Sequence, residues 1–364
     1  MDRTEPPAAS NTTRVDIGAV EVIAPNFKRR LSGVTSTIVQ LVPLQMRSLG
    51  IATLGPGLPD TLPRLKFWQL PGLLRRPAAR PFRIWHARRN VEMLAGILLR
   101  DVFRAPLRLL FTSAAQRHHK GYTKWLIRQM DAVIATSERS GSFLEVPHTV
   151  VMHGIDLQEF HPPRTEEDRF SASGLPGRYA VGCFGRVRHQ KGTDLFVDAM
   201  VALLPDFPEW TAVITGRVTT EHKAFADELK RKIDAAGLTE RIVLLGEVPD
   251  IKLWYRRVSL YVAPSRNEGF GLTPLEAMAS QTAVVASDAG AYAEQVVPGS
   301  TGAVVPAGDG GALREAIRTY LADPRLAMEH GKAGLAEVVA RFPLEREAQA
   351  IGEVYDRMWS ERAA

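Results

Sequence analysis

The chain has 364 residues, which is too long for one ordinary hydrophobic core and fits two domains of roughly 150 residues or slightly more. Its 45% hydrophobic and 24% charged residues are typical of a folded globular protein, which excludes a wholly disordered or fibrous chain. Because Cys183 is the single cysteine, the sequence excludes an intrachain disulfide and a cysteine-based zinc or iron–sulfur site.

The charge is divided unevenly along the chain. Residues 1–150 hold 22 Lys and Arg against 10 Asp and Glu, whereas residues 151–364 hold 24 against 30. The segment 61–128 alone has 15 basic and 2 acidic residues, enough to attract a phosphate-rich partner such as an anionic membrane or nucleic acid. A solvated basic face that serves only solubility explains the same counts.

No stretch approaches 18 uncharged apolar residues, and residues 1–13 lack the basic and then apolar profile of a signal peptide. The most apolar region, 91–111, contains Arg100, Asp101, Arg104 and Arg108, so it can lie on a membrane surface but cannot cross a membrane. We therefore expect a cytoplasmic protein in a reducing compartment.

Short apolar runs alternate with longer helical patterns, which predicts an α/β fold of parallel sheets covered by helices. The expected strands of the first half are 20–24, 51–54, 83–86, 107–112, 132–136 and 149–152. Those of the second half are 179–184, 211–215, 242–245, 260–263, 283–286 and 302–305, with helices at 194–204 and 222–236 between them. Two doubly wound, Rossmann-like domains of this kind place the carboxyl ends of both sheets around a central cleft, where ligands bind.

The segment 157–176 has a Pro-Pro pair, clustered charge and no apolar period, as expected of a linker. We therefore expect an N-terminal domain at 1–160, a linker with the hinge at 161–176, and a C-terminal domain at 177–341. The tail spaces its apolar residues helically, so 342–364 is expected to form a helix that braces the two domains.

A glycine-bounded turn follows the expected strand 179–184. In this turn Gly185 and Gly192 bracket Arg186 and Lys191 just before a helix opens. Glycine permits a tight turn and close backbone approach, and two cations near a helix N-terminus suit a diphosphate. Taken alone, the segment fits a phosphate cradle and a solvated basic turn equally well.

A second glycine loop follows the strand 260–263 and carries glutamates at both ends, Glu268 and Glu276. If Pro274 lies in the first turn of the next helix, Glu276 projects from that turn and Glu268 stays in the loop. Each carboxylate can then accept hydroxyl hydrogen bonds, one set from a hexose and the other from a ribose. A favourable acid at a helix N-terminus explains Glu276 alone, but not the whole loop.

Together, Gly185-Arg186…Lys191-Gly192 and Glu-x7-Glu resemble the donor half of a retaining, two-domain (GT-B) glycosyltransferase of family 4. Further matches are VVMHGIDLQEFHP from Val150, VITG from Val213, VPDIKLWYRRVSLYVAPS from Val248 and VVASDAGAYAEQV from Val284. They cover nearly all of residues 150–325. The resemblance implies that the protein transfers a sugar from a nucleotide diphosphate sugar and retains its anomeric configuration.

The resemblance also implies a role for each matching residue. Arg186 and Lys191 would hold the diphosphate and offset its charge as it leaves, while Glu268 would hold donor-sugar hydroxyls beside the reacting centre. Glu276 would bind the ribose. The implied donor-binding set is Gly33, Gly185, Arg186, Lys191, Gly216, Arg217, Val248, Glu268, Gly269, Phe270, Gly271, Leu272 and Glu276.

The acceptor half departs from the family pattern. Many members have a histidine just after the strand that here ends at 111–112, but in this chain the histidines come later, in the stretch SAAQRHHK. His118 and His119 are therefore either site residues, with His118 the catalytic candidate, or surface residues beside a basic helix, and His86 is their rival. The expected acceptor-binding set is His86, Arg88, Gln116, Arg117, His118, His119 and Lys120.

The blocks RIWHARRNVEMLAGILLRD and LLFTSAAQRHHKGYTKWLI resemble bacterial lipopolysaccharide core mannosyltransferases, which add mannose to the inner-core Kdo sugar. This resemblance implies GDP-mannose as donor, Kdo-lipid A as acceptor and peripheral association with the inner membrane. An arginine-rich domain suits the Kdo carboxylate and the lipid A phosphates, but it suits any anionic lipid equally. Two alternatives stay open: a family 4 enzyme with UDP-glucose or another donor, and a nucleic-acid-binding protein without catalysis.

No metal or other cofactor is expected. The chain has no Asp-x-Asp, and its nine histidines show no spacing typical of metal ligands. In this architecture cationic side chains and helix ends would balance the diphosphate charge. Sequence alone leaves open whether the acceptor attacks on the same face as the departing phosphate or through a short-lived covalent intermediate.

Overall fold

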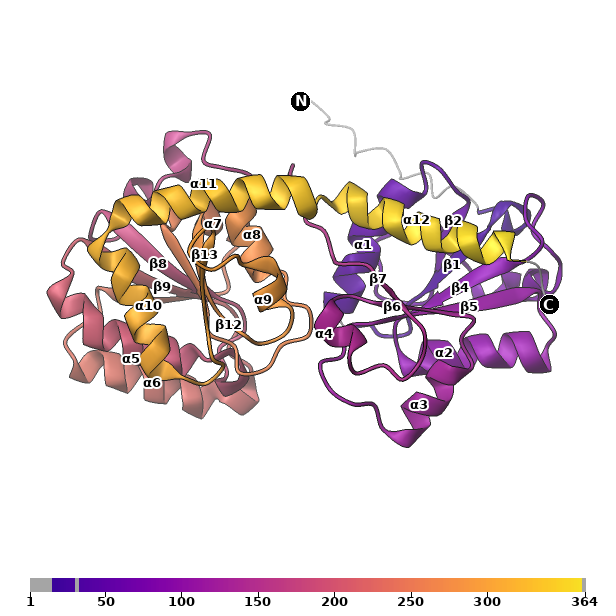
Figure 1. The fold of residues 1–364 in the computed structure, drawn as a ribbon, viewed down its shortest axis with the longest axis horizontal. Coiled ribbons are helices and arrows are strands. Elements are labelled where there is room, and N and C mark those ends of the chain that lie inside the picture. Colours follow the sequence, from indigo (N-terminus) through magenta and orange to yellow (C-terminus); the bar gives the residue numbers. More distant parts are fainter. Residues whose placement is uncertain (1–14, 30–32, 362–364) are drawn as a thin grey trace, which may run out of the picture.

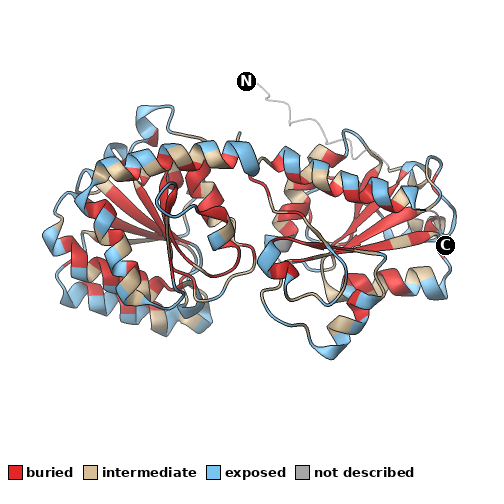
Figure 2. Ribbon diagram, viewed as in Figure 1, coloured by how far each residue is buried: buried red, intermediate tan, exposed pale blue. Residues whose placement is uncertain are grey.

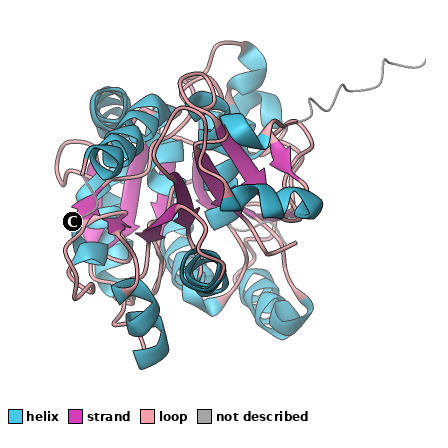
Figure 3. Ribbon diagram, turned by 90° about the vertical axis from the view of Figure 1, so that its right-hand side faces the viewer, coloured by secondary structure: helices cyan, strands magenta, loops and turns pink. Residues whose placement is uncertain are grey.

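The structure is a computed structural model that describes residues 15–29 and 33–361. Two α/β domains lie side by side, and a long C-terminal helical segment runs over both of them (Figure 1). Each domain is a parallel sheet between layers of helices (Figure 3). This is the predicted pair of Rossmann-like domains.

The N-terminal domain has a seven-stranded sheet in the order β3-β2-β1-β4-β5-β6-β7. Its strands are β1 (Val22–Pro25), β2 (Ile51–Leu54), β3 (Arg64–Leu65), β4 (Arg83–Ala87), β5 (Leu107–Ser113), β6 (Ala132–Ala135) and β7 (Thr149–Val150). Its helices are α1 (Gly33–Gln45), α2 (Asn90–Ile97), α3 (Gly121–Arg128) and α4 (Glu138–Gly141). A 3-10 segment, η2 (Phe67–Leu74), and a π-helical turn, η3 (Leu98–Val102), also belong to this domain.

The C-terminal domain has a six-stranded sheet in the order β10-β9-β8-β11-β12-β13. Its strands are β8 (Tyr179–Phe184), β9 (Trp210–Thr215), β10 (Ile242–Gly246), β11 (Leu260–Ala263), β12 (Ala283–Ser287) and β13 (Gly302–Val305). Its helices are α5 (Thr193–Leu203), α6 (Lys223–Ala235), α7 (Ile251–Arg257), α8 (Thr273–Ala279), α9 (Tyr292–Gln295), α10 (Gly310–Ala322) and α11 (Pro324–Arg341). The last helix, α12 (Leu344–Ser360), returns to the N-terminal domain.

The strands form the buried centre of each domain (Figure 2). Because helices cover both faces of a parallel sheet, its strands read as continuous apolar runs, as in the fully buried β2 and β9. All twelve expected strands are present, with ends shifted by two residues at most. The short strand β3 was not predicted, because two residues give no periodic signal.

The chain crosses between the domains twice, and the two crossing segments are bonded to each other. The backbone N–H of Ile155 donates to the Phe342 carbonyl at 2.8 Å, and that of Leu344 donates to the Ile155 carbonyl at 3.1 Å. Beyond this point α12 packs on the N-terminal domain, with Ile351 and Tyr355 buried against its core. The C-terminal tail therefore ties the first crossing segment to both domains.

The expected linker 161–176 is folded onto the C-terminal domain. It contains two short 3-10 turns, Glu166–Asp168 and Phe170–Ser173, and the Phe170 ring is buried in the C-terminal core. Asp168 forms an ion pair of 2.6 Å with Arg256 of α7, and both side chains are at most 10% exposed. The hinge placed in this segment stays a prediction.

Candidate functional site

A cavity of about 900 Å³ lies between the carboxyl ends of the two sheets and is lined by both domains. From the C-terminal domain it receives Lys191, Glu268 and Glu276. From the N-terminal domain it receives Gly33 and Arg88, among others. Strand direction places it there, because every strand in both sheets is parallel and the loops that follow them converge on one edge.

The loop after β8 is shaped by glycines that no other residue can replace without strain. Gly192 has φ +69°, and a Cβ there would lie 1.9 Å from the Pro264 carbonyl oxygen. Gly216, after β9, has φ +136°, and a Cβ there would lie 1.8 Å from the carbonyl oxygen of Gly185. The loop after β8 therefore packs backbone to backbone against the loops after β9 and β11, and its Lys191 lines the cavity.

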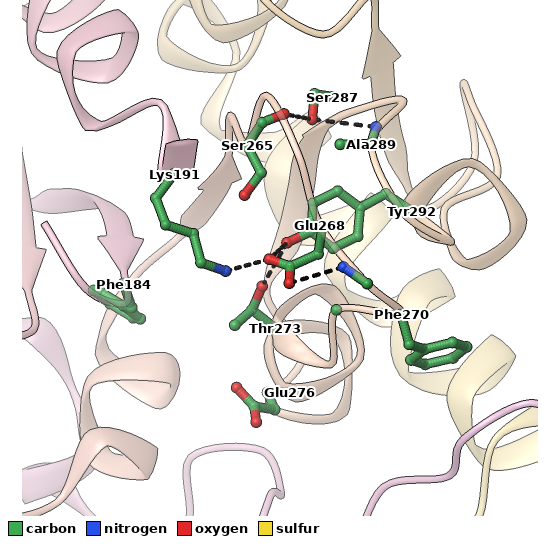
Figure 4. A network of polar contacts seen from close by, with 12 residues as sticks. Phe184, Lys191, Ser265, Glu268, Phe270, Thr273, Glu276, Ser287, Ala289 and Tyr292 are labelled. Atoms are coloured by element: carbon green, nitrogen blue, oxygen red, sulfur yellow. Dashed lines mark hydrogen bonds and ion pairs between the residues drawn. The ribbon is translucent and has the colours of Figure 1, made fainter. Parts of the chain in front are cut away.

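Lys191 and Glu268 form an ion pair that joins the two glycine loops (Figure 4). Their side chains are 20% and 18% exposed, so the pair is only partly shielded from solvent. Burial acts to lower the pKa of Lys191, but Tyr292 and Glu268 act in the other direction and raise it above its usual value. Lys191 is therefore a fixed positive charge at the cavity edge.

The loop 268–272 is held in place from behind by α9 and the turn before it. Gln295 Nε2 donates to the Gly271 carbonyl at 2.9 Å, and the Ala291 N–H donates to the Phe270 carbonyl at 3.2 Å. The Tyr292 hydroxyl lies 3.3 Å from Glu268 Oε2, and burial raises the pKa of Tyr292 to about 12. Tyr292 is therefore a neutral hydrogen-bond donor to the Glu268 carboxylate.

Glu276 lies in the first turn of α8, with Pro274 also in that turn, as the sequence predicts. The Tyr255 hydroxyl donates to Glu276 Oε2 at 2.6 Å, which fixes the carboxylate. Burial raises the pKa of Glu276, while the bond from Tyr255 and the charge of Lys191 act against that shift. The other carboxylate oxygen can accept hydroxyl hydrogen bonds from a ligand.

The remaining expected donor residues form two groups, those that line the cavity and those that do not. Gly269, Phe270, Gly271 and Leu272 line the cavity, as does Gly33 at the start of α1. Gly185, Arg186, Gly216, Arg217 and Val248 follow the carboxyl ends of β8, β9 and β10 but do not line it. Arg186 is solvent-exposed beside the Lys191 loop, so its contact with a diphosphate stays a prediction.

The structure corrects the expectation that His86 contacts the acceptor. Its side chain is fully buried, with Nδ1 at 2.7 Å from the Tyr355 hydroxyl and Nε2 at 2.7 Å from Thr112 Oγ1. Burial, followed by the charge of Arg88, holds the pKa of His86 well below its usual value. His86 is therefore a neutral residue that orients Thr112, which itself lines the cavity.

The structure also corrects the catalytic placement of His118. Its ring packs edge-to-face on Phe143 with centroids 5.2 Å apart, and it does not line the cavity. His119 lies near Ser113, and Gln116 donates to the Ser137 hydroxyl at 3.3 Å. Arg117 and Lys120 are exposed. In this part of the chain the backbone at Ala114 is what reaches the cavity.

Among the polar residues at the site that escaped sequence reasoning are Tyr255, Tyr292, His153 and Glu347. His153 Nδ1 lies 2.6 Å from Glu347 Oε1, although the two residues are 194 positions apart. His153 belongs to the stretch VVMHGIDLQEFHP, which signalled family membership but no role for this residue. Nothing in the spacing of the tail indicates that Glu347 reaches the cavity.

Comparison with known proteins identifies the family. A family model described as "Glycosyl transferases group 1" matches residues 165–336. The chain is 71% identical over 344 residues to "Lipopolysaccharide core biosynthesis mannosyltransferase LpcC" of Rhizobium leguminosarum bv. viciae, a match that covers 94% of this chain and 98% of that protein. The chain belongs to the group 1 glycosyl transferases. It is a glycosyltransferase with the predicted GT-B fold.

One further relative and one solved structure also match nearly the whole chain. The chain is 56% identical over 350 residues to "Lipopolysaccharide core biosynthesis mannosyltransferase LpsB" of Rhizobium meliloti (strain 1021), covering 94% of this chain and 99% of that protein. The solved structure of Anabaena Alr3699/HepE in complex with UDP and glucose superposes with a TM-score of 0.78 at 18% identity, covering 93% of this chain and all of that one. At that identity the likeness shows the fold alone.

Glu276 gives the first test of the site. We expect Glu276→Gln to weaken GDP binding about 10-fold, because a charge-assisted hydrogen bond is lost. Without nucleotide the same variant should melt at a higher temperature than the wild type at pH 7. The folded state raises the pKa of Glu276, so ionising it costs folding free energy as pH rises above its usual 4.5.

The difference in melting temperature should therefore vanish below pH 4.5, where the carboxyl is protonated in both the folded and the unfolded state. Thermal unfolding against pH and calorimetric titration with GDP measure the two effects. The control is Glu228→Gln on the exposed face of α6, which should change neither. A Glu276→Gln variant that binds GDP as tightly as the wild type contradicts the ribose role.

Proposed function

We propose that this glycosyltransferase moves mannose from GDP-mannose to the Kdo sugar of lipid A during lipopolysaccharide core synthesis. The observation that carries the proposal is the meeting of Lys191, Glu268 and Glu276 at one cavity in a chain 71% identical to LpcC. The two mannosyltransferase relatives match over at least 94% of this chain, so the likeness includes the acceptor domain as well as the donor domain.

The donor would lie along the C-terminal edge of the cavity. Lys191, with Arg186 beside it, would hold the diphosphate, Glu268 would accept hydroxyl hydrogen bonds from the mannose, and Glu276 would hold the ribose. Lys191 and Glu268 are paired to each other in the structure. A ligand with a diphosphate next to a sugar offers each of them a replacement partner.

The reaction would retain the anomeric configuration. The bond between the sugar C1 and the diphosphate oxygen breaks, and the acceptor hydroxyl forms the new C1–O bond on the same face. Its proton passes to the departing phosphate oxygen. Lys191 stabilises the negative charge that grows on the diphosphate, and this electrostatic contribution lowers the barrier.

We infer that the transfer needs no metal ion. Within residues 15–29 and 33–361 there is no group of three His, Cys, Asp or Glu side chains that could hold one. Lys191, with Arg186 in the same loop, would balance the charge of the diphosphate. Chelator in the transfer assay tests this inference.

The N-terminal domain would carry the enzyme to an anionic membrane through its α2–α3 face, which consists of the outer surfaces of α2, η3 and α3. Six large apolar side chains are exposed there: Val91, Leu98, Val102, Phe103, Tyr122 and Trp125. Tyr122 stacks on Trp125 with centroids 6.3 Å apart. The exposed residues Arg104, Lys120 and Arg128 add positive charge, which anionic headgroups attract.

In the described part of the chain, no helix is both long enough and apolar enough to span a bilayer. The α2–α3 face would therefore act as a surface contact, with aromatic rings at headgroup depth. Docking through this face would bring the acceptor half of the cavity near its lipid-linked substrate. The loop that includes Ala114 connects this face to the cavity, because it joins β5 to α3.

Transfer of labelled mannose tests the proposed reaction. With GDP-mannose, Kdo-lipid A and chelator present, we expect incorporation that disappears in Glu268→Ala and Lys191→Ala and persists in the control Glu228→Gln. UDP-glucose, supplied in parallel, should give none. Glucose transfer without mannose transfer contradicts the donor, and mannose transfer that stops only in chelator contradicts the metal-free mechanism.

Flotation with vesicles tests the membrane contact. We expect binding to vesicles of phosphatidylcholine and phosphatidylglycerol but not to phosphatidylcholine alone. The double variant Phe103→Ala with Trp125→Ala should bind about 10-fold more weakly, because the membrane no longer buries these two aromatic rings. The matched control is Met328→Ala, which removes an equally exposed apolar side chain from the other domain. Unchanged binding by the double variant, or tighter binding to duplex DNA than to vesicles, contradicts the contact.

A further inference from the structure

Two polar side chains in the acceptor half of the cavity have open hydrogen-bonding capacity. Arg88 follows β4, and His153 follows β7 in the first crossing segment. Both line the cavity opposite the donor loops. The described residues satisfy each of them only in part, so a ligand can complete both.

Arg88 is fixed at its backbone but free at most of its guanidinium. Its backbone N–H donates to Glu92 Oε2 at 2.8 Å, and its Nη1 reaches the His86 carbonyl at 3.3 Å. The fully buried Glu92 gives its other oxygen to Arg89 at 2.8 Å. Among the described residues, no carboxylate oxygen lies within 4.0 Å of the guanidinium nitrogens of Arg88. The planar guanidinium of Arg88 therefore presents N–H donors to the cavity that no carboxylate of the described residues binds.

His153 is held in one orientation by the C-terminal helix. Glu347 of α12 is 3% exposed and accepts from His153 Nδ1 at 2.6 Å and from the Gly154 N–H at 2.8 Å. A carboxylate only accepts hydrogen bonds, so the proton is assigned to Nδ1 and Nε2 is left as an acceptor. Within the described residues, Nε2 has no partner, and it is not sealed from the cavity.

The Phe270 ring fixes His153 relative to the donor site. The two rings pack edge-to-face with centroids 4.8 Å apart, and Phe270 belongs to the loop that carries Glu268. Burial lowers the pKa of Arg88, and Tyr355, Glu92 and Glu347 act in the opposite direction. Glu347 therefore acts on both open groups, through a hydrogen bond with His153 and through its charge on Arg88.

We infer that Arg88 and His153 form a subsite for a hydroxy acid, in which Arg88 binds the carboxylate of the acceptor sugar and His153 Nε2 accepts a hydrogen bond from one of its hydroxyls. This subsite rests on the proposed function and specifies the part of the acceptor that the enzyme reads. A phosphate dianion fits less well, because the Nε2 lone pair and the nearby Glu347 carboxylate both repel additional negative charge. A carboxylate with a neighbouring hydroxyl satisfies both groups.

Transfer kinetics with two acceptors tests the subsite: the Kdo-bearing acceptor, and the same acceptor with its carboxylate reduced to a hydroxymethyl group. For the wild type, we expect reduction to lower kcat/KM about 100-fold, as when a buried polar group loses its partner. Arg88→Gln should lower kcat/KM for the intact acceptor by a similar factor. Reducing the acceptor should not lower kcat/KM of this variant any further. GDP binding should stay unchanged in this variant.

Two variants of His153 separate hydrogen bonding from packing. His153→Gln keeps an acceptor oxygen and should retain more activity than His153→Phe, which keeps only the ring contact with Phe270. The acceptor KM should rise in both variants while GDP affinity stays constant. The control is Arg231→Gln on the exposed face of α6, which should behave as the wild type with either acceptor.

Equal losses by Arg88→Gln on both acceptors, or weaker GDP binding by that variant, would overturn the subsite. If the wild type transfers no mannose at all, the proposed reaction fails, and direct binding then decides the subsite separately. In calorimetry, the methyl glycoside of Kdo should bind to the wild type and not to Arg88→Gln, and its reduced alcohol and inorganic phosphate should bind to neither. Equal binding of the methyl glycoside of Kdo and its reduced alcohol, or tighter binding of inorganic phosphate than of the glycoside, would contradict the subsite.

Discussion

The ion pair between Lys191 and Glu268 is the interaction on which the donor half of the cavity depends. It joins two loops that lie 77 residues apart in sequence, at a point where both side chains are about one-fifth exposed. The geometry behind it is stiff, because Gly192 and Gly271 have positive φ and close backbone or ring neighbours. Each of the two charges satisfies the other, so the proposed donor would have to offer both of them a replacement partner.

The acceptor half is organised by the C-terminal helix. Tyr355 and Glu347 of α12 hold His86 and His153, which lie on the carboxyl-end loops and strands of the N-terminal sheet. The helix reaches them because the chain crosses back at 342–344, where it is bonded to Ile155. The last helix is therefore part of the site, and its apolar packing on the N-terminal domain positions polar groups that its sequence pattern does not reveal.

The features that could be predicted from the sequence are those that depend on local residue patterns. The strands and the position of Glu276 in the first turn of α8 depend on short contiguous stretches, and both are confirmed. The contact of His86 with the acceptor was wrong, and for His118 the structure favours the surface alternative, because their surroundings come from Tyr355, 269 residues away from His86, and from Phe143 in another segment. Sequence spacing carries no information about such distant contacts without a fold.

The exchange of partners by Lys191 and Glu268 is tested most directly by calorimetric titration of GDP and GDP-mannose into two variants. In the proposed donor placement Lys191 holds the diphosphate, which both ligands carry, so Lys191→Ala should weaken both by a similar factor. Glu268 holds the sugar in that placement, so Glu268→Gln should weaken GDP-mannose about 10-fold while GDP binds at least as tightly as to the wild type. If Glu268→Gln weakens GDP as much as GDP-mannose, the two residues do not divide the donor in this way.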